Sequence, residues 1–454
     1  MKRSLLLLAA GLALLASPRG AAAAEAATTA PDAAAREAGP LVLTLEQTLA
    51  LAAEQNHDVL KAREYRSLVE GRYIEEKSVA LPHFTLSGGA AYSADNSQEA
   101  LGFPVRTDNY TMKLGVVQPL FTWGQIGAAV RLADIGRSTA GDRMASARGT
   151  ALRDAALAFV EVLLAREYEA LAKQNLEQRV RHLEESRRRM AAGTATDYDV
   201  LGASVAEQNA RPEVIRTANR VSDARERLAF VLGIQGRKVD VVGSLSAAST
   251  VAPSYDAALA AAIANRPELA ELRKNRAMAE EMVRIERAGN KPRLDLGADA
   301  GYRALDMDGR TGDGTTWSAG VRLTWPVFDG GRTKGAVQRT ESDARSIGLE
   351  ERRFIDALAL ETRTGVDAVH EAAAIVEALG GTVAEAERLL AMAEKGFELG
   401  VKVRLDVDDA QLNLVQARAV LARGRRDLAA AQVNLKWITG ELSPAPAAKT
   451  DKKP

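Results

Sequence analysis

The chain has 454 residues, no cysteine, and 60 basic against 60 acidic side chains. The lack of Cys excludes disulfides, thiolate metal sites, a cysteine nucleophile and a lipid attached to an N-terminal Cys. A formal net charge of zero gives no support for a nucleic-acid partner, since proteins that bind nucleic acid favour a basic face.

The N-terminus is typical of a secretory signal peptide. Lys2 and Arg3 precede an apolar run over residues 4–16, which is shorter than a membrane-spanning helix requires, and a run of small residues follows. We therefore expect residues 1–24 to be removed after export, the alternative being an uncleaved membrane anchor. Residues 25–40 are rich in Ala and irregular, which predicts a flexible lead-in.

The remaining sequence reads as one unit written twice. Residues 45–59 resemble residues 255–269, and the turn that begins at Gly193 resembles the turn that begins at Gly400. Repetition at a fixed spacing indicates a duplicated fold, here with the order helix, strand, strand, helix, helix in each repeat. The predicted parts are a first repeat, an inter-repeat linker, a second repeat and a disordered C-terminal tail, over residues 41–233, 234–253, 254–440 and 441–454.

Two strand segments in each repeat alternate between apolar residues and polar or small ones. Successive strand residues point to opposite faces, so each strand has one apolar face and one polar face, and the polar face includes Asp295, Asp299 and Arg322. The aromatic residues at the rims of the apolar face are Tyr92, Tyr110, Tyr302, Trp317 and Trp325. About ten residues of alternation between aromatic rims fits a strand that crosses an outer membrane. An ordinary sheet packed on a helix is the alternative, and it accounts less well for the charged face.

Four strands in one chain cannot close a barrel in lipid, because open edges would leave unpaired backbone groups there. Three chains would supply about twelve strands, an even number within the known range. The membrane interpretation therefore predicts a homotrimer embedded in outer-membrane lipid. Residues 94–108 and 304–316 are expected to form surface loops. The second loop lacks the ligand spacing of a calcium site, and no metal or other cofactor is expected.

Long helices are predicted for the rest of each repeat, in keeping with an aromatic content of only 4%. The segments are 124–190, 197–232, 334–398 and 404–439. The first would span about 100 Å, and shorter helices over 44–79 and 256–288 are expected to stack on the returning helices. The last segment has an apolar residue at every seventh position from Val407 to Leu435, which favours a left-handed coiled coil. Pro212 is expected to kink or locally break the second segment.

Several features of the chain occur together: the signal peptide, the duplicated order of elements, the strand ends at 118–121 and 325–328, and two Gly-x5-Asp-Val turns. In combination they resemble the TolC family of outer-membrane efflux and secretion channels, over residues 43–440. The resemblance implies a fold of long coiled-coil helices forming an α-barrel, joined to a membrane β-barrel of about twelve strands, four from each chain of a trimer.

The resemblance also implies a function and a location. The trimer would be the exit duct of a tripartite efflux or type I secretion system, in the outer membrane of a Gram-negative bacterium and extending into the periplasm. Its partners would be a periplasmic adaptor, also called a membrane fusion protein, and an inner-membrane ABC or proton-driven pump. The duct would be gated at its periplasmic helical tip and would catalyse no reaction.

Roles at the tip follow from the resemblance, residue by residue. Asp406 and Asp409 match acidic positions that ring the closed pore, where charged side chains select and bind cations. Lys402 and Asp199 match positions of the gate, the first of which helps to hold the closed state. The alternative for these charges is a solvated helix turn.

Gly193 and Gly400 are expected to let the chain reverse at the tip, where family members also receive the adaptor. Asp408 adds a third carboxylate beside the pore positions, and no role is assigned to it. For the whole chain, the alternative to a channel is a periplasmic coiled-coil scaffold or adaptor without a pore. An enzyme is not expected, because the four His residues lack the spacing of metal ligands.

Overall fold

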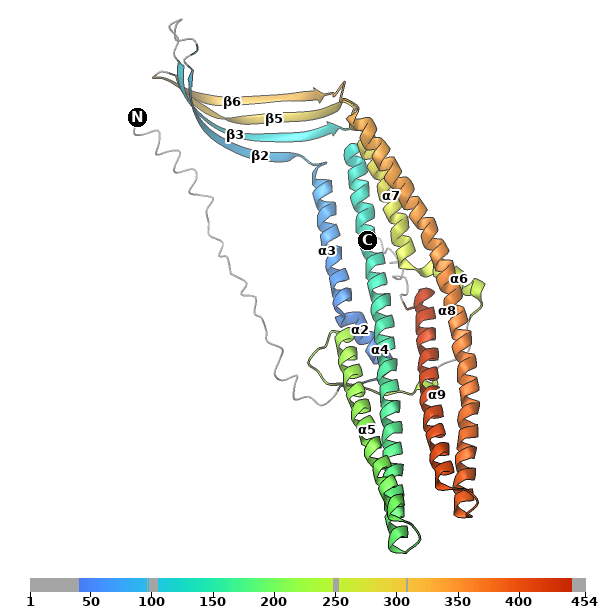
Figure 1. Cartoon of the computed structure of the whole chain (residues 1–454). Coiled ribbons are helices and arrows are strands. Elements are labelled where there is room, and N and C mark those ends of the chain that lie inside the picture. The colour runs from blue at the N-terminus through green and yellow to red at the C-terminus, as the bar shows by residue number, and fades with distance from the viewer. Residues whose placement is uncertain (1–40, 96, 98–104, 248–252, 308, 443–454) are drawn as a thin grey trace, which may run out of the picture.

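The computed structural model describes residues 41–95, 97, 105–247, 253–307 and 309–442. A four-stranded sheet lies at one end, and long helices run from it toward the other end (Figure 1). The predicted signal peptide, the lead-in and residues 443–454 of the predicted tail lie outside the described residues. In the part of the chain that is described, no helix combines the length and the apolar character needed to cross a membrane.

Both halves of the chain follow the same order of elements. The first half contains α2 (Leu45–Gln55), α3 (His57–Ser78), β2 (His83–Asp95), β3 (Val105–Phe121), α4 (Gln125–Ala191) and α5 (Asp197–Leu232). The second half contains α6 (Tyr255–Asn265), α7 (Pro267–Arg287), β5 (Arg293–Met307), β6 (Arg310–Thr324), α8 (Arg332–Glu398) and α9 (Arg404–Ile438). The predicted duplication of helices and strands is therefore confirmed.

The first predicted helix of each repeat is in fact two helices. They divide at Asn56, between α2 and α3, and at Arg266, between α6 and α7. The Asn56 side-chain oxygen accepts hydrogen bonds from the backbone N–H groups of Asp58 (2.9 Å) and Val59 (3.3 Å), and so caps α3. Pro267 begins α7, a position where proline sacrifices no helical hydrogen bond.

The large sheet joins the two halves of the chain. It is antiparallel with strand order β2-β3-β5-β6, and β3 of the first half pairs directly with β5 of the second. β2 and β6 are the edges, so in the single chain each has a hydrogen-bonded neighbour on one side only. An edge of this kind presents a row of unpaired backbone groups that another strand can complete.

The hairpin formed by β5 and β6 is longer than predicted. β5 extends to Met307 and β6 begins at Arg310, so most of the predicted loop 304–316 is strand. The predicted loop 94–108 also loses residues to β2 and β3 at its two ends. Local composition indicated a loop, but cross-strand pairing extends to Met307 and Arg310 and gives backbone groups there partners, and Gly309 has the positive φ, 85°, that a tight turn needs.

Aromatic side chains cross the sheet in a regular diagonal. From each strand to the next, the register displaces them by two residues: Tyr92 on β2, Tyr110 on β3, Tyr302 on β5 and Trp317 on β6. Strands of a barrel are tilted against its axis, so a level band of aromatic residues requires an offset of this kind. Trp325 lies just beyond the last residue of β6, at the opposite end of the sheet.

The apolar face of the sheet is uncovered in the single chain. Phe84, Trp317 and Leu323 on this face are 71%, 80% and 65% exposed. The opposite face carries ionic contacts, including Lys113 Nζ at 3.6 Å from an Asp299 oxygen. A large apolar face opposite a charged one is the distribution expected when lipid lies on one side and water on the other.

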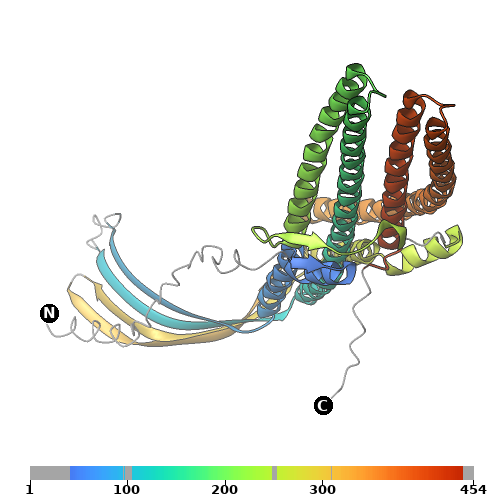
Figure 2. The ribbon, with the colours of Figure 1, turned by 90° about the horizontal axis from the view of Figure 1, so that it is seen from below.

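The long helices pair as two hairpins, α4 with α5 and α8 with α9, and Figure 2 shows the hairpins side by side. The residues of the sevenfold pattern in α9 are all buried: Val407, Leu414, Leu421, Leu428 and Leu435. Val369, Ala386 and Leu390 of α8 are buried against them. A Cβ at Gly424 would lie 3.1 Å from Leu379 Cδ1, so the small residue permits close approach.

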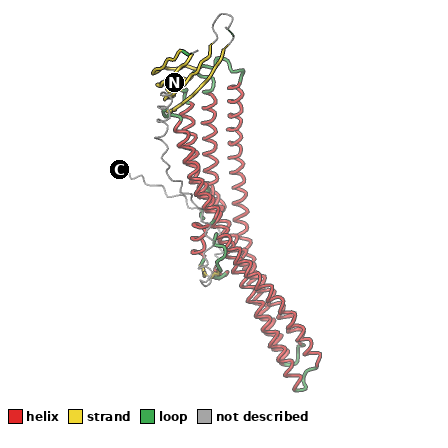
Figure 3. The backbone as a smooth tube through the Cα atoms, turned by 90° about the vertical axis from the view of Figure 1, so that its left-hand side faces the viewer, coloured by secondary structure: helices red, strands yellow, loops and turns green. Residues whose placement is uncertain are grey.

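A second, small sheet lies partway along the helices (Figure 3). It pairs β1 (Leu41–Leu43) in parallel with β4 (Val239–Val241), and the short 3₁₀ helix η3 (Leu245–Ala247) follows. β4 and η3 fall inside the predicted linker, which therefore contributes a strand to the fold. Val241 is buried in the same cluster as Phe159 and Leu228. A three-residue strand whose partner is so distant in sequence leaves no local signal.

Helix α5 runs without interruption through Pro212, so the predicted local break does not occur. Proline removes one backbone hydrogen bond from a helix interior. The buried residues Ala210 and Thr217 flank Pro212.

We predict that Gly233→Ala destabilises the junction between α5 and the break at Asn56. Gly233 has φ 72°, and a Cβ there would lie 2.4 Å from the carbonyl oxygen of Gln55. The Asn56 side chain also donates to the Val231 carbonyl at 2.7 Å, a bond that displacement would break. The left-handed conformation costs about 1–2 kcal/mol for Ala, and overlap adds about 1–3 kcal/mol. Urea unfolding measures the sum.

Gly236→Ala is the matched control for this prediction. Gly236 also has a positive φ, 86°, but a Cβ there meets no atom within 4 Å. Gly236→Ala should therefore lower the free energy of unfolding only by the cost of the left-handed backbone. Equal losses of stability in the two variants would contradict the role assigned to the Gln55 contact.

Candidate functional site

The end of the molecule farthest from the sheet is formed by two turns, one in each hairpin (Figure 1). Gly193 follows α4 with φ 75°, and Gly400 follows α8 with φ 72°. The N–H of Gly193 donates to Met190 O at 2.9 Å, and the N–H of Gly400 donates to Phe397 O at 3.1 Å. Glycine accepts this left-handed conformation without steric cost, so both residues reverse the chain as expected.

Asp199 and Asp406 occupy equivalent places at the start of α5 and α9. Asp199 Oδ2 accepts hydrogen bonds from the backbone N–H and the hydroxyl of Thr196, both at 2.8 Å. These bonds, the backbone one foremost, hold the pKa of Asp199 below its usual value. Asp406 Oδ2 likewise accepts from the Val403 N–H at 3.1 Å. Both carboxylates are therefore helix caps, a role that the Thr-x-x-Asp spacing at 196–199 signals in sequence.

Lys402 and Asp406 are brought together on the second turn. Lys402 Nζ lies 3.8 Å from Asp406 Oδ2, and both side chains are partly exposed. The Lys402 stem packs on Gly396, where a Cβ would lie 2.6 Å from Lys402 Cγ. Asp409 lies three residues after Asp406 in α9, and it is exposed. Asp199 is not part of this group, because it lies on the tip of the other hairpin.

The structure places Asp408, to which the sequence assigned no role. Its Oδ1 lies 2.8 Å from Arg179 Nη1 of α4 and 3.4 Å from Arg404 Nη2 of α9. The side chain of Arg179 is 16% exposed and that of Asp408 is 30% exposed, so the pair is largely removed from solvent. This ion pair connects the first-repeat hairpin to the second-repeat hairpin near the tip.

Three further polar groups complete this contact, which we name the α4–α9 cluster: Arg179, His182, Arg404, Asp408 and Gln411. Among the described residues, His182 Nδ1, Arg404 Nε and Gln411 Nε2 are buried without a hydrogen-bond partner. On each helix the cluster residues are spaced three or four apart and so share one face. The spacing is readable in sequence, but the pairing of the two faces is not.

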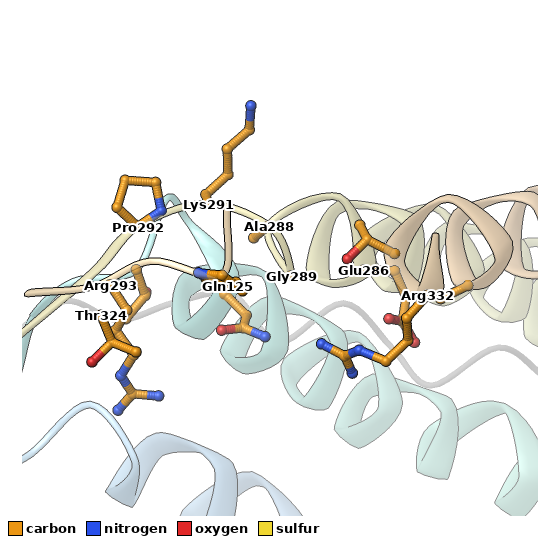
Figure 4. Close-up of a pocket in the computed structure, with 13 residues that line it drawn as sticks. Gln125, Glu286, Ala288, Gly289, Lys291, Pro292, Arg293, Thr324 and Arg332 are labelled. Atoms are coloured by element: carbon orange, nitrogen blue, oxygen red, sulfur yellow. The ribbon is translucent and has the colours of Figure 1, made fainter. Parts of the chain in front are cut away.

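A separate cavity of about 240 Å³ lies where the sheet meets α7 and α8 (Figure 4). Two of the four charged side chains that line it have ion-pair partners: Glu286 contacts Arg339 at 3.3 Å, and Arg293 contacts Asp295 at 2.9 Å. Figure 4 shows the Lys291 side chain pointing away from the residues below it. The arrangement is that of a polar junction between sheet and helices, and no group of three or more His, Asp or Glu with metal-site geometry occurs in the described chain.

Comparison with known proteins places the chain among membrane channels. A family model described as outer membrane efflux protein matches residues 48–234 and 258–441. The outer membrane protein TolC of Vibrio cholerae is 23% identical over 402 residues, covering 86% of this chain and 89% of that protein. The cobalt-zinc-cadmium resistance protein CzcC of Cupriavidus metallidurans is 27% identical over 423 residues, covering 92% and 94%.

A solved structure shows the same fold. The outer membrane protein VceC of Vibrio cholerae superposes with a TM-score of 0.73 at 20% identity, covering 87% of this chain and 96% of that one. The family match confirms the resemblance drawn from the sequence and the outer-membrane location, and it supports the channel over the scaffold without a pore. Because the matched residues include the strands, both hairpins and both tip turns, the chain belongs to the outer membrane efflux protein family.

Proposed function

We propose that the protein is the trimeric outer-membrane exit duct of a tripartite efflux or type I secretion system. The observation that carries this proposal is the four-stranded sheet, which has an exposed apolar face and two open edges. Open edges are unfavourable in lipid, so β2 and β6 require neighbouring strands from other copies. Three copies give a closed barrel of about twelve strands. The diagonal band from Tyr92 to Trp317, together with Trp325, forms its aromatic girdle.

The proposed gate lies at the helical tip. Asp406 and Asp409 form an acidic ring from the three chains, and Lys402 and Asp199 belong to the latch that holds it closed. Contact between α4 and α9 through Arg179 and Asp408 adds a connection within each chain. Such rings of charged side chains select ions by sign.

The proposed partners are a periplasmic adaptor and an inner-membrane ABC or proton-driven pump. The turns at Gly193 and Gly400 form the surface that meets the adaptor. In support, the side chains of Tyr198, Val401 and Leu405 beside these turns are 83%, 79% and 66% exposed. Exposed apolar side chains that gather in one region mark a surface that binds another protein. Relatives named for alkaline protease secretion and for cobalt, zinc and cadmium resistance point to either secretion or efflux.

Fractionation and planar-bilayer recording test the duct directly. The full chain should co-sediment with the outer membrane, should be extracted by detergent as a trimer, and should form ion-conducting channels in a planar bilayer. Recovery as a soluble periplasmic protein without conductance would replace the duct with a scaffold.

Lys402→Glu is expected to raise the conductance of the closed channel. The substitution removes the cation beside Asp406 and places another carboxylate on the same turn. An exposed pair of this kind contributes about 1 kcal/mol or less, so the increase should be a few-fold and should shrink in high salt. Lys395→Glu, at an exposed position in the last turn of α8, is the control. If the closed channel of Lys402→Glu conducts like the wild type, Lys402 is not part of the latch.

A further inference from the structure

His182 stands among charged groups at the contact between the two hairpins. The charged groups that shift the pKa of His182 are Arg179 and Glu185 of its own helix, and Arg404 and Asp408 of α9. The ring is half-buried, and its Nδ1 atom has no hydrogen-bond partner among the described residues. The imidazole therefore has two guanidinium groups and two carboxylates as neighbours, and one of these carboxylates, Asp408, already binds both guanidinium groups.

Among the described residues of α5 and α8, no carboxylate is a charged neighbour of the His182 ring. From α8, the Phe397 ring lies 5.7 Å from the Arg404 guanidinium. In the tip-proximal part of α5, the buried carboxylate of Glu207 is held by Arg211 at 2.6 Å. A proton added to His182 would thus meet Asp408 and Glu185 as its negative neighbours and Arg179 and Arg404 as its positive ones.

We infer that His182 makes the contact between the hairpins sensitive to acid, so that protonation of its ring loosens the α4–α9 cluster and favours an open tip. The inference rests on the proposed gating function, because it names a regulator of the contact that holds the tip closed. A third cation beside Arg179 and Arg404 competes for Asp408, whose carboxylate links α4 to α9 near the tip. The ion pair of Arg426 with Glu161, at 3.7 Å, joins the same helices farther from the tip. Weakening the Asp408 link frees the α8–α9 hairpin to move against α4.

The direction of the effect follows from linkage. Burial first, and Arg404 second, lower the pKa of His182 from its ordinary value of 6.5 while the hairpins are in contact. Separation of the hairpins exposes the ring and restores the ordinary pKa, so the separated form binds the proton more tightly. The contact is fully stabilised above pH 6.5 and loses stability as the pH falls below it. Each unit of pKa difference changes the ratio of open to closed states by about tenfold per protomer.

Conductance of the detergent-purified trimer in planar bilayers at pH 7.5 and pH 5.5 tests the inference. The wild type should show a several-fold rise in conductance on acidification, and His182→Gln should show little or none. His182→Lys carries a permanent charge and should give the acid-like conductance already at pH 7.5. His370→Gln alters an exposed histidine of α8 and should respond to acid as the wild type does.

The outcomes separate this inference from the proposed function. If no variant conducts at any pH, the duct itself is wrong. If the channels conduct but His182→Gln retains the full acid response, or if acid lowers conductance through His182, the inference is overturned. Asp406 and Asp409 are intact in every variant, so their own titration contributes equally to each comparison.

Discussion

Asp408→Arg is expected to raise closed-channel conductance by an order of magnitude or more. The substitution replaces the only carboxylate that bridges α4 and α9 in the cluster with a third guanidinium beside Arg179 and Arg404. A partly buried ion pair of this geometry contributes about 1–2 kcal/mol per chain, and its reversal adds repulsion of similar size. In the proposed trimer the three tips close one aperture, so the loss of stability in each chain adds to the destabilisation of the closed state.

The double variant Arg179→Asp with Asp408→Arg is the control for this result. It restores opposite charges between the same two helices, so conductance should return toward the wild-type value. Planar-bilayer recording measures both variants, and trimer recovery in detergent verifies that each one assembles. If the single reversal leaves conductance unchanged, the ion pair does not hold the tip; if the double reversal fails to rescue it, the coupling lies elsewhere.

Asp406→Asn combined with Asp409→Asn is expected to abolish most of the cation selectivity of the channel and its block by divalent cations. Six carboxylates would be removed from the proposed acidic ring of the trimer, and rings of charged side chains dominate ion selection. Asparagine is the informative replacement, because its side-chain oxygen can still accept from the Val403 N–H and preserve the cap of α9. The measurement is the reversal potential in a salt gradient, together with titration of the current by a divalent cation.

Asp197→Asn with Asp199→Asn provides the matched comparison. It removes the same number of charges, but from the tip of the other hairpin, and Asp199 also caps its helix. Selectivity should change much less, because the proposed latch role of Asp199 affects the conductance of the closed channel and not the charge of the ring. If both double variants shift the reversal potential equally, the acidic ring is not confined to Asp406 and Asp409.

Periodic features were readable from sequence. The seven-residue spacing from Val407 to Leu435 correctly predicted the buried seam of α9, because a helix face repeats with that period whatever it packs against. Strand alternation predicted both faces of the sheet for the same reason. Gly193 and Gly400 were predicted as turn residues, since few other residues adopt a positive φ.

Features that depend on one distant partner were not readable. The end of the hairpin of β5 and β6 lies in the predicted loop 304–316, whose composition indicates a loop, and cross-strand pairing overrode it. β4 gains its identity only from β1. Pro212 lies within a helix, although proline removes one hydrogen bond from a helix interior.

The sequence by itself determined the duplicated order of elements, the two faces of the strands, the coiled-coil seam and the turns of the tip, since each is written in local periodicity or in the conformational needs of single residues. Only the tertiary structure decided which charges meet. It showed that Asp406 caps its own helix and that Asp408, two residues later, reaches across to Arg179. Helical phase places adjacent carboxylates on different faces, and the partner of each face is set by how α4 and α9 pack, which no local pattern encodes.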